Sequence, residues 1–146
     1  MSHNTVKLFL YGTLMRGGML HDIIRGFDGE FIGSHLTLPI YDIVEMEGFP
    51  ALYSPKVDNT TYHIAGEVWE LPEYALDYID RVEVGYNRIK ALLTKSTKIN
   101  YNESAYLYKF AYNPFEFIIY PPKHIITISI LSITKNSIRI WVNGKN

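Results

Sequence analysis

The chain has 146 residues, of which 47% are hydrophobic and 14% aromatic, a composition typical of one compact globular domain and not of a disordered segment. Its 14 basic and 15 acidic residues leave a formal net charge of −1 without a block of like charge, so neither nucleic acid nor an anionic membrane is expected as a partner. The lack of Cys excludes disulfides, a thiolate nucleophile and Cys-bound zinc, and the five scattered His residues lack the spacing of a preformed metal site, so no metal or other cofactor is expected.

The N-terminal segment predicts a strand that runs into a glycine turn. Residues 6–11 (VKLFLY) are rich in β-branched and aromatic side chains, and Gly12, Thr13 and Leu14 follow directly. The apolar run is too short for a signal peptide or a membrane span, which makes a cytoplasmic location the default expectation. Where a strand ends, backbone N–H groups lose their partners and can turn toward one anion, although an ordinary turn fits the same residues.

One short helix and two strands are expected next, followed by a break. Residues 20–26 predict a helix closed by Gly26, and residues 27–47 predict two strands separated by Gly and Pro. In residues 48–52 (GFPAL), Gly permits an unusual backbone angle and Pro fixes one. We therefore expect a rigid connection here, either a pocket wall or a plain loop.

The middle of the chain predicts a strand, the main helix and another strand. Residues 61–71 form the first strand, in which the internal Gly66 is typical of a bend, a bulge or a close backbone approach. Residues 73–82 predict a helix, because apolar residues recur there at three-residue spacing behind a proline. Glu83 follows at the carbonyl end, where helices prefer cations, so its position suggests a functional reason. Residues 86–93 predict the next strand.

The remainder of the chain predicts a polar turn, a strand and a terminal hairpin. Residues 97–103 read as the turn and residues 104–110 as the strand. Residues 118–146 form a β-rich extension, in which residues 125–133 and 138–142 are two β-prone runs. An unpaired hairpin of this kind is an aggregation hazard, so either the main sheet or the second subunit of a homodimer should cover it. No repeat or linker suggests a second domain, and we expect one domain over residues 1–146, with its core at about 6–110.

Four fragments, in this order, resemble the gamma-glutamylcyclotransferase-like superfamily. They are LFLYGTLMRG (8–17), GFPALY (48–53), AGEVWEL (65–71), and IDRVE with YNR just after it (79–88). The resemblance covers residues 6 to about 110, and Trp141 is similar to the family's usual ending. It implies an α+β fold with a small mixed β-barrel and flanking helices, to which this chain adds its β-rich C-terminal extension.

The resemblance also implies a pocket where the YGTL-type loop faces a glutamate that follows the main helix. At matching positions, the loop is Tyr11, Gly12, Thr13 and Leu14, and the glutamate is Glu83. LDYID, which ends at Asp80, also resembles the family's acidic motif with Asp in the acidic place, so Asp80 is the alternative. Val84 stands where the family commonly has Gly, which bears on the shape of the pocket.

The family's reaction suits these residue types. In a γ-glutamyl amine, amino acid or peptide, the substrate's α-amine attacks its own γ-carbonyl, which forms 5-oxoproline and expels the attached amine without an enzyme nucleophile. Glu83 would move the proton, provided that an apolar pocket raises its pKa. Backbone amides of Gly12, Thr13 and Leu14 would bind the oxyanion or the substrate carboxylate, with Tyr11 and Tyr86 as polar supplements, whereas Arg88 is expected mainly to pair with a carboxylate. The alternative function is a non-catalytic member that binds a small molecule in the same cavity.

Overall fold

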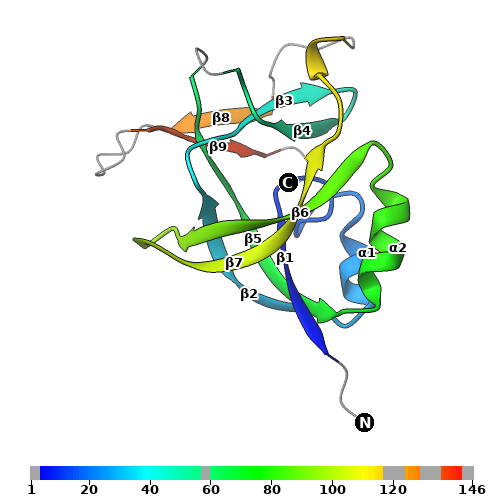
Figure 1. Ribbon diagram of the computed structural model, residues 1–146. Coiled ribbons are helices and arrows are strands. Elements are labelled where there is room, and N and C mark those ends of the chain that lie inside the picture. The colour runs from blue at the N-terminus through cyan, green and yellow to red at the C-terminus, as the bar shows by residue number, and fades with distance from the viewer. Residues whose placement is uncertain (1–3, 57–59, 117–123, 129–135, 143–146) are drawn as a thin grey trace.

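The computed structural model describes residues 4–56, 60–116, 124–128 and 136–142, and its central feature is a closed β-barrel (Figure 1). Five strands are hydrogen-bonded in the order β1 (Thr5–Leu10), β7 (Lys98–Phe110), β6 (Tyr86–Lys95), β2 (Glu30–Thr37) and β5 (His63–Pro72). The pairing of β5 with β1 closes the barrel, and the parallel β1–β7 pair makes it mixed because the other pairs are antiparallel. The predicted fold class, a small mixed barrel with helices beside it, is confirmed.

Two short helices lie together at one side of the barrel (Figure 1). They are α1 (His21–Gly26) and α2 (Ala75–Val82), and a 3₁₀ turn, η1 (Pro114–Glu116), follows β7. The helical face of α2 that the spacing predicted is buried, with Leu76 and Ile79 in the core. The helix begins two residues later than predicted. The segment before it is a turn, in which Leu76 N–H donates to the Glu73 carbonyl at 3.1 Å. In the described ranges, neither helix is long and apolar enough to cross a membrane.

Residues 48–52 are not a connection, so that prediction was wrong about secondary structure. The strands β3 (Asp42–Met46) and β4 (Phe49–Tyr53) pair antiparallel as a separate two-stranded sheet. Gly48, with φ of +81°, forms the turn between them. Pro50 is tolerated in β4 because both strands of a two-stranded sheet are edge strands, where a missing N–H need not break a ladder.

Residues 97–103 are also not a turn region, because β7 already begins at Lys98. Only residues 96 and 97 connect it to β6, and Leu93 of β6 lies opposite Glu103 of β7. The tip of this hairpin is exposed to solvent, so its side chains are polar without interrupting the backbone pairing.

The C-terminal hairpin packs on the main sheet, one of the two arrangements that the sequence allowed. Strand β8 (Ile125–Ile128) pairs antiparallel with β9 (Ile138–Trp141), and β9 pairs parallel with β5. Polar contacts to β3 anchor it, since Trp141 Nε1 donates to Glu45 at 3.1 Å and Arg139 binds Asp42 at 2.8 Å. The rest of the predicted extension, residues 118–123, 129–135 and 143–146, lies outside the described residues.

Candidate active site

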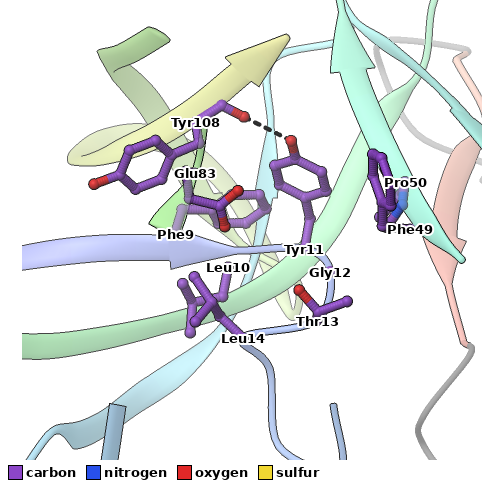
Figure 2. A pocket seen from close by; sticks show the side chains of 10 residues that line it. All are labelled: Phe9, Leu10, Tyr11, Gly12, Thr13, Leu14, Phe49, Pro50, Glu83 and Tyr108. Carbon is purple, nitrogen blue, oxygen red and sulfur yellow. Dashed lines mark hydrogen bonds between the residues drawn. The ribbon is translucent and has the colours of Figure 1, made fainter. Parts of the chain in front are cut away.

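A narrow cavity lies where β1 ends, between the turn that follows β1 and the end of α2 (Figure 2). The cavity has a volume of about 30 Å³, which is room for a small polar group. The lining residues come from β1 and its turn, β4, the end of α2 and β7: Phe9, Leu10, Tyr11, Gly12, Thr13, Leu14, Phe49, Pro50, Glu83 and Tyr108. The structure thus brings together the four residues of the predicted loop and the predicted glutamate. Of the two alternatives for residues 48–52, a pocket wall or a plain loop, the lining by Phe49 and Pro50 matches the pocket wall.

In the described part of the chain, two backbone amides of the turn after β1 have no acceptor. Met15 N–H donates to the Gly12 carbonyl at 3.0 Å, which places Thr13 and Leu14 at the two central positions of the turn. Their carbonyls are held from the other side, by Leu20 N–H at 2.9 Å and by the His21 ring at 2.7 Å. No hydrogen bond from either amide is found among the described residues. These N–H groups are therefore available to an anionic ligand group.

A buried carboxylate fixes the end of this turn to the barrel. Glu67 of β5 accepts hydrogen bonds from Arg16 N–H at 2.9 Å and from Arg16 Nε at 3.0 Å, and Trp69 Nε1 donates to the same side chain at 3.2 Å. Sequence reasoning did not identify Glu67, and the available signal was that β5 does not alternate cleanly between polar and apolar residues. Of the three features that Gly66 suggested, a bend, a bulge or a close backbone approach, the close approach is present, because a Cβ there would lie 2.2 Å from the Leu10 carbonyl oxygen.

Glu83 is the C-cap residue of α2, and its carboxylate points into the cavity, toward Tyr11 and the turn (Figure 2). Its backbone N–H continues the helix by donating to the Ile79 carbonyl at 2.9 Å. Burial raises the pKa of the Glu83 carboxyl to about 7. Among the described residues, no cation or hydrogen-bond donor pairs with this carboxylate. At neutral pH, both the protonated and the ionised form are therefore substantially populated, as proton transfer in both directions requires.

Asp80, the alternative acidic residue, has a different environment. It does not line the cavity, and Tyr108 OH donates to its Oδ1 at 2.7 Å while Arg88 lies 3.5 Å from Oδ2. The carboxylate is thus engaged by a hydroxyl and a cation, and Arg88 is the carboxylate partner that the sequence suggested. Through Asp80, α2 holds the Tyr108 ring at the cavity wall. Sequence analysis placed Tyr108 on a strand but gave no sign that it would reach the site.

The two predicted tyrosines use their hydroxyl groups to hold the structure together. Tyr11 OH donates to the Tyr108 carbonyl at 2.6 Å and accepts from Leu52 N–H at 3.4 Å, whereas Tyr86 OH donates to the Pro50 carbonyl at 3.0 Å. Burial, together with nearby Glu83, raises the pKa of both phenols, so both stay protonated. Tyr11 contributes its ring to the cavity wall, but Tyr86 is not among the lining residues. Together they connect β4 to the barrel.

Val84, where the family commonly has Gly, does not shape the cavity. Its side chain is 82% exposed and lies outside the lining. The following residue, Gly85, has φ of +90° and makes the reversal from α2 into β6. In the described ranges, no three His, Asp or Glu side chains lie close enough together to hold a metal ion.

By its fold, a closed mixed barrel with two short helices beside it, the chain falls in the class of AIG2-like proteins. An AIG2-like protein from Mus musculus has a similar structure, with a TM-score of 0.65 and 22% sequence identity over 83% of this chain and 91% of that chain. A protein specific to uropathogenic E. coli gives a TM-score of 0.61 and 22% identity over 73% and 80% of the two chains, and an uncharacterised protein from Pyrococcus horikoshii gives 0.57 and 21% over 75% and 80%.

The family model for "Gamma-glutamyl cyclotransferase, AIG2-like" matches residues 8–120, so the chain belongs to this family. The match extends the predicted resemblance from about residue 110 to residue 120 and ends before Trp141. No match is found among curated proteins.

Proposed function

We propose that this protein cyclises the γ-glutamyl group of an amine, amino acid or peptide to 5-oxoproline and releases the attached amine. Family membership supports a cyclotransferase-type activity in general. The observation that carries the specific reaction is Glu83, a half-buried carboxyl group whose pKa is raised to about 7. Among the described residues, neither this carboxyl group nor the backbone amides of Thr13 and Leu14 beside the same cavity have a hydrogen-bond partner.

In the proposed reaction, Glu83 moves two protons, one after the other, from the attacking nitrogen to the leaving nitrogen. The ionised carboxylate takes a proton from the substrate's α-ammonium, and the resulting amine attacks the γ-carbonyl carbon to form the five-membered ring. The C–N bond to the leaving amine then breaks as Glu83 gives this proton to that nitrogen. The ionised carboxylate next takes the second proton from the ring nitrogen, which leaves the neutral lactam, and passes it to the released amine, which becomes an ammonium ion. The carboxyl group ends ionised, as it began, and no water is consumed. A residue with a pKa near the working pH can perform both transfers.

The turn after β1 supplies the second requirement, which is stabilisation of negative charge. The amides of Thr13 and Leu14 are fixed in place because Leu20 and His21 hold the carbonyls of the same turn. Donors that are oriented before the reaction stabilise a developing oxyanion without a reorganisation cost, and they can equally hold a substrate carboxylate. The apolar rings of Phe9, Tyr11 and Tyr108 exclude water beside Glu83.

The test is to incubate the purified protein with a panel of γ-glutamyl amines, amino acids and peptides and to measure 5-oxoproline. At least one compound is expected to react, and Glu83→Gln is expected to lower kcat by about 10²–10⁴ while the circular dichroism spectrum stays unchanged. Turnover by Glu83→Gln at the wild-type rate would remove Glu83 from the mechanism.

The second candidate function is binding without catalysis, and the narrowness of the cavity favours it. If no compound in the panel yields 5-oxoproline while a small carboxylate or amine raises the melting temperature, the site binds and does not react. Under that outcome, Glu83→Gln should abolish the thermal stabilisation by an amine, because only a carboxylate pairs with its charge.

A further inference from the structure

The C-terminal hairpin, which lies beside β3 (Figure 1), holds that strand through one buried carboxylate, Glu45. Both contacts reach the same oxygen of this side chain, Oε1. Trp141 Nε1 of β9 donates to it at 3.1 Å, and His124 Nδ1, just before β8, lies 2.6 Å from it. Trp141 is itself buried, so water is kept away from this junction. The hairpin therefore fixes the position of Glu45.

The same hairpin is anchored on the barrel. Strand β9 pairs with β5 at His63 and Ile64, and His63 N–H donates to the Ser137 carbonyl at 3.0 Å. The hairpin thus connects the barrel to the separate two-stranded sheet of β3 and β4. Both β8 and β9 follow the residues 8–120 that match the family, so this connection lies outside the matched part of the chain.

Glu45 leads directly to the cavity that contains Glu83, because the residue opposite it on β4 is Pro50. Directly opposed residues share one face of a sheet, with their Cβ atoms about 4.5–5.5 Å apart. Pro50 lines the cavity, and its ring packs on the turn after β1, since a Cβ on Gly12 would lie 2.9 Å from Pro50 Cγ. From the barrel, Tyr86 OH donates to the Pro50 carbonyl at 3.0 Å. This cavity wall is therefore held between the barrel and Glu45.

We propose that Glu45 is a positioning residue of the active site, through which the C-terminal hairpin holds Pro50 and its cavity wall against the turn after β1. Glu45 does not line the cavity and acts through Pro50. The inference rests on the proposed function for its effect on turnover, because the wall sets the space in which a substrate meets Glu83. Its effect on the exclusion of water from the cavity does not depend on any reaction.

The titration of Glu83 reports whether the wall is in place. Burial raises the pKa of this carboxyl to about 7, so a displaced wall that admits water should lower the pKa toward its ordinary value. Among the described residues, the titratable side chains that interact electrostatically with Glu83 are the phenols of Tyr11, Tyr86 and Tyr108, from β1, β6 and β7. Burial raises the pKa of each phenol, so none of them ionises in the pH range where Glu83 does.

The test is Trp141→Phe, which keeps an aromatic ring in the core but removes the donor to Glu45. Protein labelled with ¹³C at the glutamate carboxyl groups is titrated by NMR from pH 4 to 9, and Glu83→Gln assigns the Glu83 signal. The Glu83 midpoint should fall by about 0.5–1 pH unit, and kcat/KM for a γ-glutamyl compound by about three- to tenfold. His124→Ala removes the half-exposed second contact and should shift the midpoint in the same direction, which keeps the test valid if Trp141→Phe does not fold.

Two further variants separate positioning from a general loss of stability. Glu45→Gln keeps an oxygen that accepts from Trp141, so it should retain the wild-type midpoint. Thr94→Val removes the hydrogen bond of 2.9 Å from buried Thr94 Oγ1 to the Lys98 carbonyl, at the opposite end of β6 from Tyr86. This control should lower the melting temperature and leave both the Glu83 midpoint and kcat/KM unchanged.

An unchanged Glu83 midpoint in folded Trp141→Phe, or an equal shift in Thr94→Val, would overturn the proposal. A shift that is confined to Trp141→Phe, in a protein whose wild type releases no 5-oxoproline from any compound, supports the positioning role and overturns the proposed reaction. Release of 5-oxoproline together with an unshifted midpoint overturns the positioning role and leaves the reaction standing.

Discussion

The burial of Glu83 predicts that removing its charge stabilises the folded protein, and only at high pH. Burial raises the pKa of Glu83 from 4.5 to about 7. At about 1.36 kcal/mol for each pKa unit, this shift lowers the unfolding free energy by about 3 kcal/mol when Glu83 is ionised. The full cost applies if the ionised carboxylate stays in the cavity. Glu83→Gln replaces the side chain by a neutral group of nearly the same shape, so the variant should escape this cost.

The sign follows from which state binds the proton more tightly. Between pH 4.5 and about 7, the folded protein holds the Glu83 proton while the unfolded chain releases it, so stability falls as the pH rises through this window. Below pH 4.5, both states are protonated and the wild type and Glu83→Gln should be equally stable at this site. Above about pH 7, the variant should be more stable by up to about 3 kcal/mol.

The assay is urea denaturation of both proteins at several pH values from 4 to 9, followed by circular dichroism. Glu47→Gln is the matched control, since Glu47 is an exposed carboxylate in the β3–β4 turn and its removal changes the net charge equally. The unfolding free energy of Glu47→Gln should differ little from that of the wild type, and by a nearly constant amount across this pH range. Parallel curves for Glu83→Gln and wild type across the whole range would refute the reasoning, because they would mean that Glu83 ionises as if it were in water. The expected combination, higher stability with lost turnover, is typical of a residue retained for function.

Three further variants test the support of the site. Asp80→Asn should lower kcat/KM only about threefold and unfolding free energy by about 1 kcal/mol, because Asp80 holds Tyr108 and a partly exposed arginine and does not face the cavity; loss of turnover on the scale of Glu83→Gln would reverse the assignment of the two acids. Gly12→Ala should lower kcat/KM by about tenfold or more, because the added Cβ would lie 2.9 Å from Pro50 Cγ and push the turn away from β4. Wild-type kinetics in this variant would contradict the close approach. Glu67→Gln should destabilise the protein by about 1–3 kcal/mol in urea, because it weakens the charge-assisted bonds that hold the turn, and an unchanged midpoint would show that they add nothing.

The parts of the structure that the sequence predicted correctly depend on local patterns. The strand before Gly12 and the face of α2 that contains Ile79 were predicted from residue types and spacing that act within a few residues. The segment around Pro50 was mispredicted because proline argues against a strand unless the strand is an edge, and edge position is a tertiary property. The polar start of β7 was missed for a similar reason, since exposure of a hairpin tip is not encoded in its own residues.

The sequence by itself determined the family, the turn after β1 and the two acidic candidates near the end of α2. It could not decide between Glu83 and Asp80, because they lie three residues apart with similar chemistry. The tertiary structure separates them by packing Phe9 and Tyr108, from strands distant in sequence, around one carboxyl group, while Tyr108 and Arg88 engage the other. A pKa depends on the loss of water around a charge, and only segments that meet in the folded chain can remove that water.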